Sequence, residues 1–242
     1  MAEEIKTTSS VIQNMFKNMQ ITVEDEAVID QFESEQQAQK NEAAFAKSGI
    51  AEKFKTTDIA DIISVGLPEM NDNKGHALTM DIIDRFIADV ANGKPRVLFF
   101  FGEPGTGKST MAIAIMHELC KKSVSCAYFK SHEIMQRLDD VKWRCSKETR
   151  AGIVQEVCTP TFRIFDEIGR YPDSKGEQFV LFDMTNRIYE TFGSGIYITN
   201  LPKSETSEFL GKAVIDRCRG IGMTIEFNGK TLRGTEKELY TK

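Results

Sequence analysis

The stretch Gly102–Ser109, "GEPGTGKS", matches the pattern G-x-x-x-x-G-K-[ST] at every required position. It follows the apolar run "RVLFFF" (96–101), which predicts a buried strand, and it precedes "STMAIAIMHEL" (109–119), which predicts a helix. A glycine-rich loop between a strand and a helix is the context in which backbone N–H groups bind the phosphates of a nucleotide. This context disfavours a simple glycine-rich turn and predicts a nucleotide-binding protein.

The residues of this loop have separate expected roles. Gly102, Gly105 and Gly107 allow the backbone to turn tightly and to direct its N–H groups at phosphate oxygens. Lys108 is expected to reach the β and γ phosphates, and the Ser109 hydroxyl to bind Mg²⁺. The remaining residues that we expect to contact the nucleotide are Glu103, Pro104, Thr106 and Thr110.

Short apolar strands alternate with longer helices from residue 94 onward, which is typical of an α/β protein with a parallel sheet covered on both faces. With 40% hydrophobic residues, the 242-residue chain can bury a sizeable core. We expect five strands flanked by helices. The predicted strands are residues 96–101, 124–129, 161–165, 195–199 and 223–227, and the predicted helices are residues 108–121, 131–139, 177–191 and 205–218.

An acidic pair follows the third predicted strand, in "TFRIFDEIG" (161–169). A carboxylate at the tip of a neighbouring strand can complete the Mg²⁺ shell, and a second beside it can polarise the attacking water. We assign the first role to Asp166 and the second to Glu167. An isolated Asp-Glu pair more often opens a solvated loop, but a pair that ends a buried strand after a phosphate loop favours nucleotide hydrolysis.

Two later segments offer polar groups to the same chemistry. Asn200 follows the strand in "GSGIYITN" (193–200), where its amide could orient the water or contact the γ phosphate, although Asn is also a common turn residue. In "LGKAVIDRCRG" (210–220), Arg217 or Arg219 could stabilise the transferred phosphoryl group from a neighbouring subunit. We prefer Arg217, because Asp216 could hold it; basic residues are also simply favourable at a helix C-terminus.

The N-terminal segment differs from the rest in charge. Residues 1–48 carry nine acidic and four basic side chains, and the remainder carries 27 of each sign. The segment reads as helices over about 10–47, either a hairpin folded back on its own domain or a partner-binding module, and its acidity argues against a nucleic-acid arm. We divide the chain into this segment, a linker and domain start at 49–75, and a nucleotide-binding domain at 76–242.

A basic stretch with the only tryptophan lies between the second and third strands. "VKWRCSKETR" (141–150) contains Lys142, Trp143 and Arg144, which could bind single-stranded DNA through phosphate contacts and base stacking. The alternative is a buried tryptophan beside a solvated charged face, which is the commoner situation. No apolar run reaches the length of a membrane span and no signal peptide begins the chain, so a cytoplasmic protein without a membrane partner is expected.

The phosphate loop, "FDEIG", "YITN" and "VIDRCRG", in this order, resemble the AAA+ ATPases. From about residue 44 onward the chain more closely resembles the bacterial replicative-helicase loaders of the DnaC type, with "FAKSGIAEKF" (45–54) before the ATPase domain. The resemblance implies an AAA+ fold that binds ATP or ADP with Mg²⁺ and hydrolyses ATP. It assigns the ATPase roles to Lys108, Ser109, Asp166, Glu167, Asn200 and Arg217, and it adds Arg233, in "KTLRGTE", as a nucleotide contact within the subunit.

The same resemblance implies partners. In that family an N-terminal helical segment binds the hexameric replicative helicase, and the ATPase domains assemble in a spiral that helps to open the ring around single-stranded DNA. Residues 1–47 would then be the helicase-binding module. Two alternatives stay open: a transposition ATPase that acts on transposase and target DNA, and a nucleotide-gated adaptor that binds ATP without significant turnover.

Overall fold

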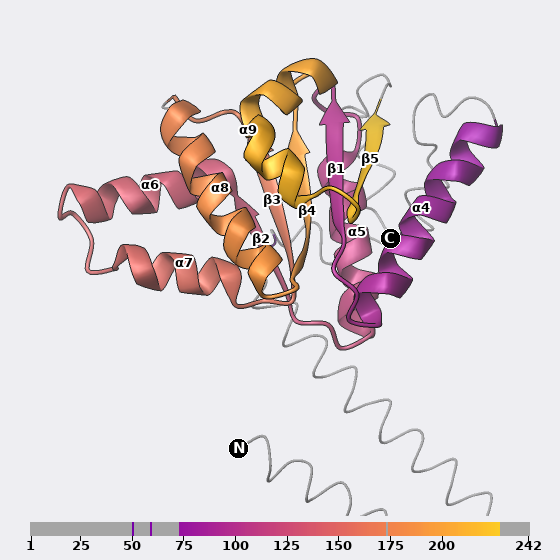
Figure 1. Ribbon diagram of the computed structural model, residues 1–242, viewed down its shortest axis with the longest axis horizontal. Helices are drawn as coiled ribbons and strands as arrows, with labels where there is room; N and C mark the ends of the chain where they lie inside the picture. The colour runs from indigo at the N-terminus through magenta and orange to yellow at the C-terminus, as the bar shows by residue number, and fades with distance from the viewer. Residues whose placement is uncertain (1–49, 51–58, 60–72, 173, 228–242) are drawn as a thin grey trace, which may run out of the picture. The chain divides into compact units, whose positions relative to one another are not determined.

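The computed structural model describes residues 50, 59, 73–172 and 174–227. Within them, five strands form a parallel sheet in the order β2-β3-β4-β1-β5 (Figure 1). The predicted α/β class and five-stranded parallel sheet are therefore confirmed. The strands are β1 (Val97–Gly102), β2 (Cys126–Lys130), β3 (Phe162–Ile168), β4 (Ser194–Thr199) and β5 (Gly222–Phe227).

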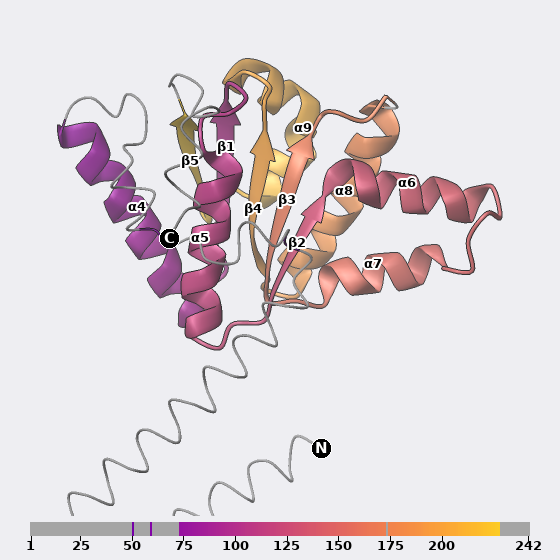
Figure 2. The same ribbon diagram turned by 180° about the vertical axis from the view of Figure 1, so that it is seen from behind.

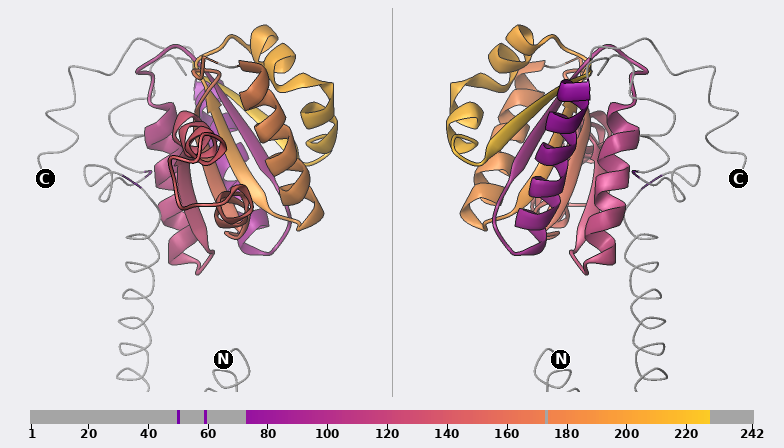
Figure 3. Two further views of the ribbon diagram at one scale, coloured as in Figure 1. Left: turned by 90° about the vertical axis from the view of Figure 1, so that its left-hand side faces the viewer. Right: turned by 90° about the vertical axis from the view of Figure 1, so that its right-hand side faces the viewer.

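Helices cover both faces of this sheet (Figure 3). The helix bounds are α4 (Asn73–Ala91), α5 (Lys108–Lys121), α6 (Ser131–Lys142), α7 (Arg150–Cys158), α8 (Ser174–Glu190) and α9 (Lys203–Arg217). Helices α4 and α5 pack on one face. Helices α8 and α9 pack on the other face, in one core with buried residues of α6 and α7, which form a hairpin beside the edge strand β2 (Figures 1 and 2).

The sheet separates two apolar cores because successive side chains of a strand point to opposite faces. In β1, Leu98 and Phe100 pack with α4 and α5, whereas Phe99 packs with Tyr197 and with α8 and α9. A central parallel strand buried on both faces needs apolar residues at every position, which is why β1 reads as a continuous apolar run rather than an alternating one.

Two helices were not predicted, α4 and α7, although each has a recognisable signal. In α4 the buried residues Ile83, Phe86, Ile87 and Val90 follow the i, i+3, i+4, i+7 spacing of a helix that buries one face. Helix α7 begins after Thr149, whose side chain accepts a hydrogen bond from the Gly152 N–H at 3.0 Å. Threonine is a favoured N-cap residue, so Thr149 was the signal for the start of this helix.

Some predictions lie outside the described residues. These are the helical segment 1–48, most of the linker 49–75, and Arg233. In the part of the chain that the structure describes, no helix combines the length and apolar character needed to cross a lipid bilayer.

Candidate active site

The phosphate loop connects β1 to α5 and has a backbone that its glycines allow. The φ angles of Gly102, Gly105 and Gly107 are 132°, 84° and 91°, in a region that side chains with a Cβ rarely adopt. A Cβ at Gly102 would lie 2.3 Å from the carbonyl oxygen of Phe227 on β5. No side chain caps the first turn of α5, so none competes with an anion for its N–H groups.

Lys108 points back into this loop. The residue is 5% exposed, and its Nζ donates to the carbonyl oxygens of Gly102 and Glu103 at 2.7 Å each. The Thr106 hydroxyl donates to the same Glu103 oxygen at 2.8 Å. A buried ammonium group is stable only with acceptors around it, and phosphate oxygens are stronger, charged acceptors. The ammonium group is therefore held by the loop that is expected to bind the phosphates.

The acidic pair lies in a bulge of β3. The register between β3 and β4 shifts here: Phe165 pairs with Tyr197 and Ile168 pairs with Thr199, so residues 165–168 of β3 lie opposite the shorter stretch 197–199 of β4. Glu167 has a φ of 59°, which is unusual for a residue other than glycine. Bulges often redirect side chains next to active sites, and non-glycine residues with a left-handed backbone are often found at active sites as well. Strand β3 therefore continues past its predicted end at residue 165. Within the bulge, Asp166 and Glu167 do not follow the regular alternation of side chains between the two faces of the sheet.

Asp166 has both carboxylate oxygens in defined hydrogen bonds. Oδ2 accepts from the Tyr128 hydroxyl of β2 at 2.7 Å, and Oδ1 accepts from the Glu167 N–H at 2.7 Å. Burial, and then the negative charge of Asp166, raise the pKa of Tyr128 well above its usual value, so the tyrosine keeps its proton and donates it. The Asp166 carboxylate and the Ser109 hydroxyl are the hard oxygen donors that Mg²⁺ prefers, so these residues fit that ion.

Glu167 is held by two residues that sequence analysis missed. His132 Nδ1 lies 2.9 Å from Glu167 Oε2, and Arg170 Nη1 donates to Oε1 at 2.8 Å. Each oxygen retains a second acceptor position, so the carboxylate can still bind a water molecule. His132 lies two residues after the end of β2, and this position at the carboxyl end of a strand of the same parallel sheet was the available signal.

Asn200 lies between the phosphate loop and the acidic pair. Strand β4 runs between β1 and β3, so the strand that carries the acidic pair is the second neighbour of β1. Phe100 pairs with Ile198, which makes Gly102 and Asn200 level at the carboxyl edge of the sheet. The Thr199 hydroxyl donates to the carbonyl oxygen of residue 168 at 2.9 Å and ties β4 to the tip of β3. Asn200 is exposed at this edge.

The two arginines at and just after the end of α9 differ from expectation in one respect. Asp216 pairs with Arg219, at 3.4 Å, and not with Arg217. The turn that ends α9 brings Arg219 back to Asp216, since the Arg219 N–H donates to the Asp216 carbonyl oxygen at 3.1 Å, whereas adjacent residues of a helix do not share a face. The proposed support of Arg217 by Asp216 is therefore wrong. Instead, Arg217 Nε donates to Asn186 Oδ1 of α8 at 2.9 Å. The finger role of Arg217 stays a prediction.

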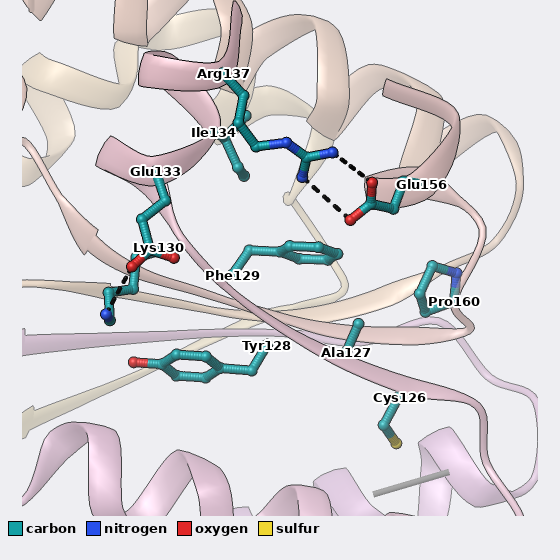
Figure 4. A pocket seen from close by; sticks show the side chains of 10 residues that line it. All are labelled: Cys126, Ala127, Tyr128, Phe129, Lys130, Glu133, Ile134, Arg137, Glu156 and Pro160. Carbon is teal, nitrogen blue, oxygen red and sulfur yellow. Dashed lines mark hydrogen bonds and ion pairs between the residues drawn. The ribbon is translucent and has the colours of Figure 1, made fainter. Parts of the chain in front are cut away.

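The α6–α7 hairpin lies beside β2 and extends outward past this edge of the sheet (Figure 1), while its buried residues, Ile134 and Val157 among them, pack in one core with α8. Arg137 of α6 joins its two arms by pairing with Glu156 of α7 at 2.6 Å and with Glu148 of the connecting loop at 2.5 Å. These carboxylates, Glu156 first, hold the pKa of Arg137 above its usual range. A hollow of about 400 Å³ lies between the hairpin and β2, with Phe129 and Ile134 in its lining (Figure 4).

Trp143 lies where α6 ends and is 70% exposed, so the alternative of a buried tryptophan is wrong. Lys142 Nζ lies 5.4 Å from the centroid of its ring, and Lys142 and Arg144 are both exposed. An exposed tryptophan beside two cations at the end of a projecting helix has the composition of a base-stacking surface. Contact with DNA is still a prediction.

The family described as IstB-like ATP binding protein matches residues 78–239, from α4 past the end of β5. The chain belongs to this ATP-binding family. It is 25% identical to the replicative helicase loader DnaC of Escherichia coli K12, over 202 residues that cover 83% of this chain and 79% of the relative. It is 27% identical to an ATP-binding protein of insertion sequence IS5376 of Geobacillus stearothermophilus, over 67% of this chain and 61% of that protein.

Solved structures show the same fold at lower identity. A crystal structure of DnaI matches with a TM-score of 0.60 and 19% identity, covering 76% of this chain and 95% of that one. A crystal structure of the DnaC helicase loader matches with a TM-score of 0.57 and 19% identity, covering 73% and 99%. The AAA+ type of P-loop fold that the sequence predicted is thereby confirmed, as is membership of the IstB/DnaC family.

Proposed function

We propose that this member of the family is an ATP-hydrolysing loader of the hexameric replicative helicase. One observation supports hydrolysis above all: the P-loop lysine and an acidic pair in a bulge lie at the same edge of one sheet, with Asn200 between them. Similarity to a replicative helicase loader over most of both chains supports the replicative helicase as the partner on which the protein acts. The role is remodelling of a partner rather than synthesis of a product.

The residues divide the chemistry between them. Lys108 binds the β and γ phosphates, and Ser109 and Asp166 hold Mg²⁺, which neutralises charge on the phosphates when it is bound. Glu167 accepts a proton from the attacking water, and Asn200 orients that water. Arg217 enters the site of an adjacent subunit of the spiral and stabilises the charge of the transferred group. The loop residues from Gly102 to Thr110, and Arg233, complete the nucleotide contacts.

The client is tested by capture of the replicative helicase with full-length protein and with a version that begins at Gly49, each with ATP and with ADP. We expect the full-length protein to retain the helicase and the shortened protein to lose at least about 90% of it, because the deletion removes the residues that would carry most of the binding energy. ATP hydrolysis by the shortened protein is the folding control. Equal capture by both would contradict the role of residues 1–48, and capture by neither would remove the helicase as client.

We propose further that the tip of the α6–α7 hairpin binds single-stranded DNA. Replacing Trp143 by Ala is expected to weaken binding of a fluorescent oligonucleotide by about tenfold, because stacking of one base contributes about 1–3 kcal/mol. Trp143→Phe should restore most of the affinity. Phe192, which is 73% exposed beyond the end of α8, supplies the matched control in Phe192→Ala. Equal affinity of the Trp143→Ala and control proteins would exclude this surface.

A second candidate function is that of a transposition ATPase, and the similarity to an insertion-sequence protein favours it. Such a protein would act on a transposase and target DNA. Parallel captures with a helicase and with an IS21-type transposase as bait separate the two functions: retention of only the transposase would replace the loader assignment. A nucleotide-gated adaptor, the third alternative, would bind ATP but show no turnover with any client.

A further inference from the structure

A buried carboxylate lies behind the acidic pair and has no place in the chemistry described above. Glu177 belongs to the first turn of α8 and is 0% exposed. Its Oε1 accepts hydrogen bonds from the Ser131 hydroxyl and, at 3.2 Å, from the Gly169 N–H. Its Oε2 is buried and has no hydrogen-bond partner among the described residues.

These two donors flank the groups that hold Glu167. Ser131 directly precedes His132, whose Nδ1 lies 2.9 Å from Glu167 Oε2. Gly169 lies two residues after Glu167, where the β3 bulge returns to the loop, and has a φ of 84°. One carboxylate oxygen therefore connects both the start of α6 and the end of β3 to α8. The two residues of the Glu167–His132 contact lie next to these connections in the chain, His132 after Ser131 and Glu167 two residues before Gly169.

Stability alone gives a poor account of this residue. Burial of a carboxylate with an unpaired oxygen costs free energy, and an apolar side chain of similar size would avoid that cost. An acidic residue in the first turn of a helix is favourable through the helix dipole, but an exposed glutamate would provide the same benefit without burial. What a buried acceptor adds is a fixed position for two separate donors.

We infer that Glu177 is a positioning residue for Glu167. It fixes the start of α6, and with it His132, relative to the β3 bulge, and so sets the direction of the Glu167 carboxylate. This inference rests on the proposed hydrolysis of ATP. It adds a residue that touches neither nucleotide nor water and acts through His132 and the Gly169 turn.

Three variants test it. Glu177→Met removes the acceptor at similar volume, whereas Glu177→Gln keeps an oxygen that both donors can reach. Thr185→Val removes another buried hydrogen bond of α8, the one between the Thr185 and Tyr197 hydroxyl groups at 2.9 Å, and is the matched control. We expect Glu177→Met to lower kcat about tenfold, as loss of a supporting contact commonly does, with the nucleotide Kd changed by less than about twofold. Glu177→Gln should retain most of the turnover.

A second readout does not depend on turnover. The chain has three histidines, so the His132 ring resonances can be assigned by comparison with His132→Gln and followed in each variant. The inference requires that they move in Glu177→Met and stay in place in Glu177→Gln and Thr185→Val. Unmoved resonances in Glu177→Met, or equal losses of kcat in Glu177→Met and Thr185→Val, would overturn it. If the unmodified protein hydrolyses no ATP, the proposed function fails, and the resonances alone decide the positioning role.

Discussion

Glu167→Gln is expected to lower the rate of ATP hydrolysis by at least about 100-fold, because removal of a general base commonly costs 10²–10⁴-fold. The nucleotide Kd should change by less than about twofold, because the amide keeps the size of the side chain and the phosphate contacts lie elsewhere. Arg170 can still donate to the amide oxygen, as it does to Glu167 Oε1 at 2.8 Å. The variant should therefore accumulate in the ATP-bound state and hold the helicase more persistently.

The matched control is Glu133→Gln, which changes an exposed glutamate of α6 that pairs with Lys130 at 2.8 Å. Single-turnover hydrolysis and fluorescent-nucleotide binding should be measured for both proteins. A Glu167→Gln protein that hydrolyses ATP at an unchanged rate would show that Glu167 is not the base. It would then favour the adaptor, whose function needs ATP binding only.

The arrangement of the sheet was predictable where local sequence determines it. The strand before the phosphate loop is apolar at every position, and the loop itself requires glycine at positive φ, so strand, loop and helix are encoded within residues 96–121. The order of the strands was not predictable in the same way. That β4 separates β1 from β3 follows from long-range pairing, which no single segment specifies.

The surroundings of Glu167 also depend on contacts between distant segments, which the local sequence does not predict. Its type and position after a buried strand identified the residue, but the bulge that turns it arises from the register between β3 and β4. Its partner His132 is 35 positions away and meets it only because β2 and β3 are adjacent. Trp143 shows a different limit. Tryptophan is usually buried, but this one follows the last turn of α6, whose earlier residues Ile134 and Leu138 are buried while the end of the helix is exposed.

Lys108→Ala is expected to abolish detectable ATP binding, with Kd raised by at least about 100-fold, because hydrogen bonds to charged groups contribute about 1.5–3 kcal/mol each and a phosphate chain would accept more than one. The unmodified protein with ligand at 100 times Kd should gain about 2.7 kcal/mol of stability. For a domain of this size that corresponds to a rise in Tm of about 5–10 °C. The Lys108→Ala protein should show no rise.

The loss must be separated from a general defect of the loop, because Lys108 Nζ also donates hydrogen bonds to the carbonyl oxygens of Gly102 and Glu103. Lys121→Ala, at the exposed other end of α5, controls for loss of a lysine from the same helix. Lys108→Arg keeps a cation that can donate to those carbonyl oxygens but places its charge differently. The Lys108→Arg protein should therefore have an unchanged Tm without ATP and should lose most of the increase in Tm that ATP causes. A Lys108→Ala protein that still gains Tm with Mg²⁺ and ATP would place the phosphates outside the loop, and the assignment of every loop residue from Gly102 to Thr110 would fall with it.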